Sequence, residues 1–399
     1  MVAAGGEHTV LLRSDGTVVA CGRNGPGQCD FQALAGGLTH VQVSAGGDHT
    51  VLLLSDGSTV ACGRNEFGQC DLPALVGGLT FVQSAAGGDH TVLLRSDGSA
   101  VASGDNDFGQ CDLPLLVEGL TFVQCAAGGG HTVLLRSDGS AVASGNNDFG
   151  QCEVPPLVGE LRYVRVAAGG DHTVFIRSDG AAVSCGLNNL GQCDVPVLVS
   201  GLTYLRAAAG FNHTLLLRSD SIVVACGCNH FGQCDLPALV GGLAYLQVAA
   251  GGDHTVLLRS DGSAVACGDN DFGQCDLPAP VGGLAYTAHL LPSLLLQASL
   301  DGDSIAFVTL AGVERCRVSA APLTRLAAVR GHLLAELRAG RLGAGLARVD
   351  AVLPGGRRLS AAPLAETVAA AFGLRRLRVR GKRPASAYGG ERDAVQRRR

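Results

Sequence analysis

The chain has 399 residues, a formal net charge of −5 and 47% hydrophobic residues, which is ample for a packed core. We see no basic leader with an apolar core and cleavage site, and no run of 18 uncharged apolar residues. These absences argue against a secreted or membrane-spanning chain, so we expect a soluble protein of the cytoplasm or nucleus.

A unit of 41 residues occurs seven times between Met1 and Thr287. The stretch GGDHTVLLRSDG is found letter for letter at Gly87–Gly98 and Gly251–Gly262. A fixed period of this length predicts a repeat architecture. One histidine recurs in every unit, at His8, His49, His90, His131, His172, His213 and His254. Catalysis needs different groups in different roles around one point, so we interpret these seven histidines as structural.

Within one unit, short apolar runs alternate with turn residues. Unit seven reads LQVAA, then HTVLLR, the turn Ser260–Gly262, SAVACG, a glycine-rich loop and CDLP. No helical period is visible, and four short runs separated by turns predict a four-stranded antiparallel blade. One such sheet cannot bury both of its faces, so the blades must stack around an axis. The sequence therefore predicts a mainly β, seven-bladed propeller over residues 1–287.

The pattern GGDHTVLLRSDG…VACGDNDFGQ resembles the RCC1 repeat, and inhibitors of the BLIP-II type have a similar short repeat. The resemblance implies a seven-bladed β-propeller and, in one branch of the family, guanine-nucleotide exchange on a small GTPase. Another branch senses ultraviolet light through tryptophans, which this chain lacks. Cysteine stands where the family often has tryptophan, at Cys62 and Cys267, and Ser221 replaces a turn glycine in unit six.

The ring requires a closing strand. After Leu284-Ala285-Tyr286 the repeat pattern predicts a strand such as VQVAAGG, and Met1–Gly6 (MVAAGG) has that pattern. We expect the N-terminal segment to complete the last blade beside the first, which would protect the sheet edges.

One loop varies where the rest of the unit repeats. It follows the third strand and reads GRNEFGQ, GDNDFGQ or GLNNLGQ in different units. Its asparagine and its mostly aromatic residue recur, so we assign both to the blade framework. The changing positions predict a partner-binding rim on one face, because variable loops on a rigid fold commonly carry binding sites. They are Arg23, Arg64, Glu66, Asp105, Asp107, Asn146, Asp148, Leu187, His230, Asp269 and Asp271. The alternative is that these are solvated loops whose sequence varies freely because they have no binding role.

The fifteen cysteines do not predict disulfides or a metal site. Most fall at two positions of the unit, such as Cys62 and Cys70, and the first position becomes Ser103 and Ser144 in two units. The C-x7-C spacing is not that of a zinc site. The loop DNDFG lacks the later acidic ligand of a calcium loop. We therefore expect free, small, buried thiols, with no metal and no cofactor.

Residues 288–399 change in character. We assign a linker to 288–300, a small ubiquitin-like (β-grasp) α+β domain to 301–381 and a basic flexible tail to 382–399. IAFVTL and ERCRVS predict two strands, and Leu323–Arg338 has helical spacing. Residues 1–300 carry 11 arginines against 27 acidic side chains, whereas 301–399 carry 19 basic against 8 acidic ones. An acidic propeller repels a phosphate backbone, while the tail could attract one.

These observations favour a non-catalytic scaffold or adaptor, expected to be monomeric, whose rim binds a partner protein of unknown identity. An exchange factor for a small GTPase is the alternative, but seven units of equal length leave no room for a protruding insertion. A substrate adaptor in a ubiquitin ligase pathway is a further alternative, because 288–399 is too short for a HECT-like catalytic domain.

Overall fold

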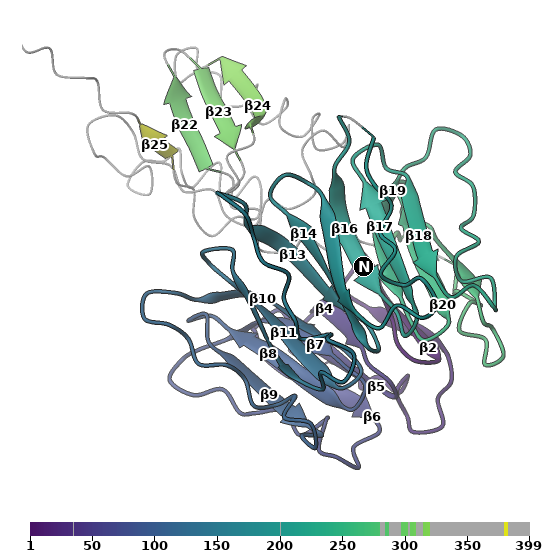
Figure 1. The fold of residues 1–399 in the computed structure, drawn as a ribbon. Helices are drawn as coiled ribbons and strands as arrows, with labels where there is room; N and C mark the ends of the chain where they lie inside the picture. Colours follow the sequence, from purple (N-terminus) through teal and green to yellow (C-terminus); the bar gives the residue numbers. More distant parts are fainter. Residues whose placement is uncertain are drawn as a thin grey trace, which may run out of the picture. The chain divides into compact units, whose positions relative to one another are not determined.

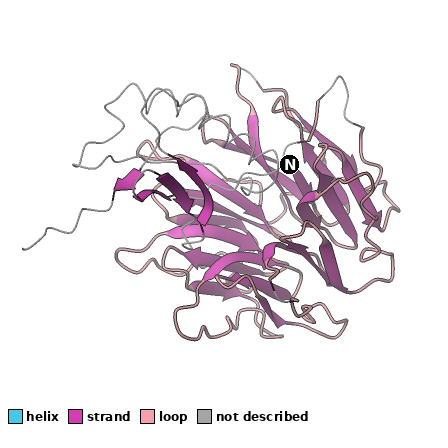
Figure 2. Ribbon diagram, turned by 90° about the horizontal axis from the view of Figure 1, so that it is seen from above, coloured by secondary structure: helices cyan, strands magenta, loops and turns pink. Residues whose placement is uncertain are grey.

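The computed structural model describes residues 1–34, 36–199, 201–279 and 284–286, together with four further strands within 297–381. The chain divides into two compact units, Met1–His289 and Leu290–Arg399. In the first unit, seven antiparallel sheets of three strands each follow one another along the chain, and the described residues contain no helix (Figures 1 and 2). The prediction of a mainly β, seven-bladed propeller is confirmed.

Each blade consists of three consecutive strands. The first strands are β1 (Val2–Ala4), β4 (His40–Ala45), β7 (Phe81–Ala86), β10 (Phe122–Ala127), β13 (Tyr163–Ala168), β16 (Tyr204–Ala209) and β19 (Tyr245–Ala250). The middle strands are β2 (His8–Leu12), β5 (His49–Leu54), β8 (His90–Arg95), β11 (His131–Arg136), β14 (His172–Arg177), β17 (His213–Arg218) and β20 (His254–Arg259). The third strands are β3 (Val18–Gly22), β6 (Thr59–Gly63), β9 (Ala100–Gly104), β12 (Ala141–Gly145), β15 (Ala182–Gly186), β18 (Val223–Gly227) and β21 (Ala264–Gly268).

The core lies between neighbouring blades. The middle strands read as unbroken apolar runs because both of their faces are covered, and the alternation typical of half-buried strands is missing. Val51 and Leu53 of blade two pack against Phe81 and Leu93 of blade three in one such layer. The first strands also contact one another from blade to blade, in the order β1, β4, β7, β10, β13, β16, β19 and back to β1. The ring is therefore closed.

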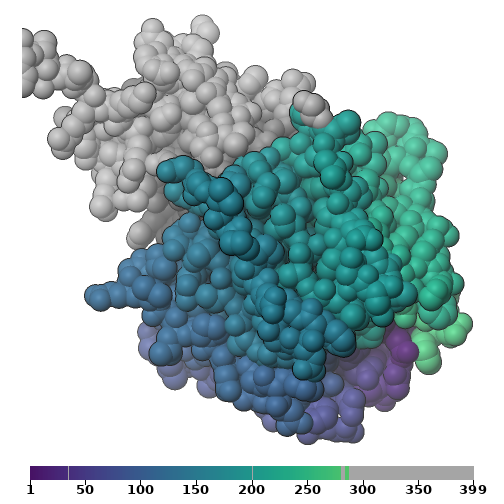
Figure 3. Space-filling view, in the orientation of Figure 1, coloured from purple at the N-terminus to yellow at the C-terminus, as the bar shows by residue number. Residues whose placement is uncertain are grey.

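The closure differs from the prediction in one respect. The strand at Val2–Ala4 pairs with β2 in the first blade and not with the last blade, which has three strands of its own. Tyr286 then forms a bridge with Arg13 of the same first sheet. In blade seven, Tyr245 at the start of β19 is paired with Arg259 in the equivalent way. The first blade is thus assembled from both ends of the ring, and Figure 3 shows the purple N-terminal residues beside the green ones that end it.

The predicted fourth strand of each blade is wrong. Cys275–Pro278 forms no ladder, because the Cys275 amide donates to the side chain of Asn270 and the Leu277 amide donates to the Cys275 carbonyl. This segment is held by the Tyr286 hydroxyl, which donates to the Pro278 carbonyl. Three other blades have the same contact, for example from Tyr204 to the Pro196 carbonyl at 2.7 Å.

The tight turn between the second and third strands shows why one sequence departure matters. Gly262 occupies this turn in blade seven with φ of 81°, in the left-handed region. Ser221 takes the same conformation in blade six, with φ of 66°, and it is the only non-glycine residue with positive φ in the part of the chain described. A side chain in this region costs free energy that glycine avoids.

The second unit contains a four-stranded sheet in the order β24-β23-β22-β25. Its strands are β22 (Gln297–Asp301), β23 (Ser304–Val308), β24 (Glu314–Ser319) and β25 (Val379–Gly381). The two strands expected at IAFVTL and ERCRVS are confirmed as the hairpin β23–β24, and β25 runs parallel to β22. However, β22 begins inside the stretch assigned to the linker. The expected helix at Leu323–Arg338 and the tail at 382–399 lie outside the described residues, so the ubiquitin-like domain and its boundaries stay predictions.

Candidate partner-binding face

Two loops of every blade emerge on the same face of the ring. One is the Gly-Gly-x-His turn after the first strand, and the other is the loop after the third strand. Arg23 of the second loop pairs with Glu7 of the first at 2.8 Å, and Gln28 reaches Asp48 in the next blade at 3.3 Å. We call this the rim face. Its loops interlock from blade to blade, so it is a rigid surface.

Beneath the rim face, the seven histidines form a belt between blades. His8 Nε2 lies 2.9 Å from Thr50 Oγ1 of the next blade, and the Thr50 hydroxyl donates to the Gln28 carbonyl at 2.8 Å. Because that hydroxyl hydrogen is committed, His8 must donate through Nε2. The contact recurs around the ring as His49–Thr91, His90–Thr132, His131–Thr173, His172–Thr214, His213–Thr255 and His254–Thr9.

These histidines are fully buried and neutral at pH 7. Burial lowers the pKa of His8 to about 3 and that of His49 to about 4. Each imidazole also lies directly against a backbone turn: a Cβ at Gly5 would come within 2.3 Å of His8 Cε1. No substrate could reach such a group, and this geometry supports a structural role for the belt.

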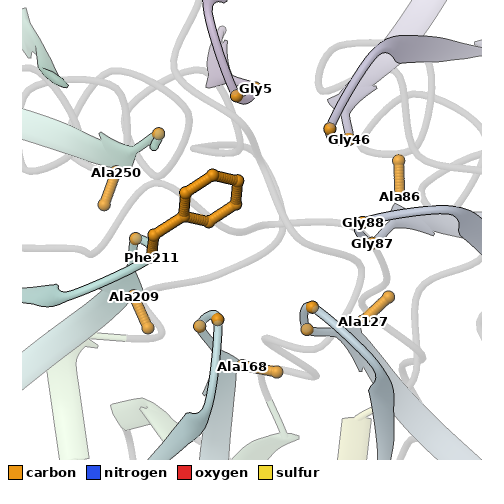
Figure 4. A pocket seen from close by; sticks show the side chains of 18 of the residues that line it. Gly5, Gly46, Ala86, Gly87, Gly88, Ala127, Ala168, Ala209, Phe211 and Ala250 are labelled. Carbon is orange, nitrogen blue, oxygen red and sulfur yellow. The ribbon is translucent and has the colours of Figure 1, made fainter. Parts of the chain in front are cut away.

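The axis of the ring is a narrow opening. The Ala-Gly-Gly turns of six blades and the Ala-Gly-Phe turn of blade six surround a cavity of about 80 Å³, and the side chain of Phe211 points into it (Figure 4). The turns approach so closely that a Cβ at Gly46 would lie 2.4 Å from the Gly87 carbonyl oxygen. Ligand pockets usually measure about 300–1,000 Å³. The rim face, and not the axis, is therefore the candidate site.

The predicted rim residues all lie on the rim face, in two positions of the variable loop. The position directly after the third strand is mostly half-buried and is filled by Arg23, Arg64, Asp105, Asn146, Leu187 and Asp269. The position before the aromatic residue is exposed and is filled by Glu66, Asp107, Asp148, His230 and Asp271. The structure brings these side chains to one surface, and their role in binding stays a prediction.

The asparagine of this loop belongs to the framework, as predicted. Asn65 Oδ1 accepts from the Cys70 amide at 2.7 Å, and its Nδ2 donates to Asp71 at 2.9 Å. The assignment of the aromatic residue to the framework is wrong, because its side chain is exposed by 39–56% in six blades. We call these side chains the apolar tips. They are Phe67, Phe108, Phe149, Leu190, Phe231 and Phe272.

Sequence reasoning also missed a ring of carboxylates in the Gly-Gly-x-His turns. They are Glu7, Asp48, Asp89, Asp171 and Asp253. Burial raises the pKa of Asp89, and Asp105 and Asp48 raise it further, while Arg64 opposes them. Burial and the charge of Asp148 likewise raise the pKa of Asp171. The residue at position x of the Gly-Gly-x-His turn changes between units, and this variation was the sequence signal that could have revealed these acids. Acidic side chains thus repel one another across the rim face.

The cysteines are free, as expected, in the part of the ring described. Cys70 Sγ donates to the Arg64 carbonyl at 3.3 Å, and Cys62 Sγ donates to the Gln28 carbonyl of the preceding blade at 3.5 Å. Most are half-buried, and only Cys125 and Cys228 are fully buried as predicted. Within the described residues, no group of three histidine, cysteine, aspartate or glutamate side chains could hold a metal ion, and no helix is long and apolar enough to cross a membrane.

A closed ring of seven blades with loops gathered on one face defines a β-propeller built from sequence repeats. The chain belongs to the RCC1 family: the model of the regulator of chromosome condensation (RCC1) repeat matches all seven units. The matched residues are 2–28, 41–69, 81–110, 122–151, 163–192, 207–233 and 246–274.

Solved structures show the same fold. Human WBSCR16 is 20% identical with a TM-score of 0.55, over 64% of this chain and 85% of that one. Prp20p from Saccharomyces cerevisiae is 19% identical with a TM-score of 0.55, over 68% and 83%. The CRINKLY WD40 ectodomain of the Arabidopsis thaliana receptor kinase ACR4 is 20% identical with a TM-score of 0.52, over 72% and 97%. A comparison with curated proteins finds no match.

Proposed function

We propose that the propeller is a non-catalytic scaffold that binds a partner protein through its rim face. The observation that carries this proposal is the ring of apolar tips, which are held out into solvent by a rigid framework. The Phe108 amide donates to Gln110 Oε1 at 3.0 Å, and the Gln110 side chain is itself buried. Exposed aromatic side chains are enriched at the centres of protein interfaces.

Two further features support a protein partner. The positions beside the apolar tips differ in charge from blade to blade, which gives a surface that can discriminate between partners. In addition, yeast RCC1 (Prp20) has been crystallised bound to Kap60, and Prp20p has been studied for its binding to Gsp1p and histones. A role as an adaptor that joins this partner to a second one, or to a ubiquitin ligase, belongs to the same proposal.

Site-specific cross-linking tests the proposal. A photoreactive phenylalanine analogue replaces Phe149 on the rim face, and in a control chain it replaces Val123, which is exposed at the opposite end of β10. After irradiation in an extract of the native organism, we expect a defined adduct from position 149 and none from position 123. Adducts from position 123 alone, or none from either, would overturn the proposal.

The exchange-factor alternative has one observation in its favour, the match to the RCC1 repeat itself. Exchange requires an element that enters the nucleotide site of the GTPase, and the rim loops are of equal length in all seven units. Release of a fluorescent GDP analogue from a panel of small GTPases, with and without the full chain, separates the two functions. Accelerated release would favour the alternative.

A further inference from the structure

Two of the apolar tips are covered by arginines of the chain itself. The Arg23 guanidinium carbon lies 5.7 Å from the ring centroid of Phe272, and that of Arg64 lies 5.5 Å from Phe67. The same guanidinium groups pair with carboxylates of the rim face: Arg23 with Glu7 at 2.8 Å, and Arg64 with Glu66 of its own loop and, at 4.0 Å, with Asp89. Each arginine is thus held by an aromatic face and a carboxylate together.

A buried glutamine connects the apolar tip to a carboxylate. Gln69 accepts from the Phe67 amide at 3.0 Å and donates to Asp89 at 3.1 Å, so one buried glutamine joins the tip to an acid. Gln233 joins Phe231 to Asp253 in the same way, with distances of 3.1 and 2.9 Å. We call each set of phenylalanine, glutamine and carboxylate a cradle.

Two more cradles are built with the same parts. Gln151 accepts from the Phe149 amide at 3.0 Å and reaches Asp171 at 3.4 Å. Gln110 accepts from the Phe108 amide and donates to Asp105 at 2.8 Å, so the acid here comes from the same loop.

Three cradles have no arginine over the ring among the described residues. Their phenylalanines are exposed by 56% (Phe108), 51% (Phe149) and 54% (Phe231), against 46% for Phe67 and 49% for Phe272 under the arginines. Two of their acids are also crowded: burial and the charge of Asp269 raise the pKa of Asp253 against the opposing effects of His230 and Gln233, and burial and the charge of Asp148 raise the pKa of Asp171. A cation would relieve this repulsion.

We propose that the cradles of Phe108, Phe149 and Phe231 bind arginine side chains from a basic segment of the partner protein. The incoming guanidinium would stack on the phenylalanine ring and pair with the carboxylate, as Arg64 stacks on Phe67 and lies 4.0 Å from Asp89. Arginine suits this site better than lysine, because a planar, weakly hydrated guanidinium both stacks and forms paired hydrogen bonds. The excess of acidic side chains in residues 1–300 favours a basic partner. The inference rests on the proposed function and adds the chemistry of the partner.

Two fluorescein-labelled peptides test this inference with the full chain. One alternates arginine with glycine, and the other has lysine in place of every arginine. We expect fluorescence anisotropy to show tighter binding of the arginine peptide, by about threefold for each ring occupied. Asp171→Asn with Asp253→Asn should weaken the binding of both peptides.

Leucine is the matched control for the ring, because Leu190 already occupies the position in blade five. The variant Phe108→Leu/Phe149→Leu/Phe231→Leu keeps apolar bulk, and we expect it to reduce the preference for arginine, because the arginine peptide loses more from the missing rings than the lysine peptide does. Conversely, Arg64→Ala uncovers Phe67 and Asp89, and the affinity for the arginine peptide should rise by about threefold.

Equal affinity for the two peptides, or an unchanged preference in the leucine variant, would overturn the inference. If neither peptide binds while cross-linking from position 149 still gives an adduct, the inference fails and the proposed function stands. If both experiments fail, the rim face is not a protein-binding site.

Discussion

His254 Nε2 lies 2.8 Å from Thr9 Oγ1, although 245 residues separate them along the chain. This contact belongs to the same belt as His49–Thr91 within the ring, whose atoms are 2.9 Å apart. The joint between the last and first blades is therefore built from the same parts as every other joint.

The joint can be tested by Thr9→Val, with Thr91→Val as the control from an interior joint. Each change leaves a buried histidine donor unpaired and removes the hydroxyl that donates to a glutamine carbonyl, and we expect a loss of about 1–3 kcal/mol in the free energy of unfolding. Urea denaturation should give similar losses for both variants. A negligible loss for Thr9→Val alone would mean that the ring is open in solution.

Acid should destabilise the ring through the histidine belt. Folding lowers the pKa of these histidines from 6.5 to about 3 or 4, so the unfolded chain binds protons that the folded chain excludes. Their contribution is complete above pH 6.5 and falls as the pH drops below it, by about 1.4 kcal/mol per pH unit for each histidine. We expect urea midpoints to fall steeply between pH 6.5 and 5. Midpoints that stay constant over this range would contradict the belt geometry.

Ser221→Gly should stabilise the protein. The substitution removes a side chain from a left-handed turn, which favours the folded state by about 1–2 kcal/mol, and the added freedom of glycine in the unfolded chain offsets part of this. We expect a net gain of about 0.5–1 kcal/mol in thermal or urea unfolding. The reverse change, Gly262→Ser, is the matched control and should destabilise. A loss of stability in Ser221→Gly would show that the serine makes a compensating contact.

The thiols should react only when the fold opens. Burial raises the pKa of Cys62 and Cys185 to about 12, so almost no thiolate is present at pH 8. Titration with a thiol reagent should be slow for the ring thiols of the native protein and should find all fifteen cysteines after unfolding without reductant. Several missing thiols would indicate disulfides.

The sequence predicted the ring well and the binding surface only in part. The constant spacing of the histidines was sufficient for the architecture, because a 41-residue unit that cannot bury both faces alone must stack on its neighbours. Recurrence was misleading at Phe108, however. A residue that repeats in most units looks like framework, yet this side chain is exposed, and only the buried Gln110 beneath it holds the blade.

Other differences arise from contacts between distant residues. The bridge between Tyr286 and Arg13, which joins the C-terminal end of the ring to the first blade, depends on the register between segments at opposite ends of the ring. Likewise, the acids of the Gly-Gly-x-His turns become part of the candidate site only when the preceding blade brings its glutamine beside them. Such pairings have no signature within a single unit.

The shared first blade has a consequence for the order of folding. Val2–Ala4 can pair with β2 as soon as both have been synthesised, but Tyr286 joins that sheet only after six more blades exist. Until then, the flanks of the first and last blades expose the apolar side chains that later pack together, among them Leu11 and Leu258. A nascent chain of this protein therefore passes through an incomplete arc with two exposed apolar flanks. At this stage, association between chains would compete with closure of the ring.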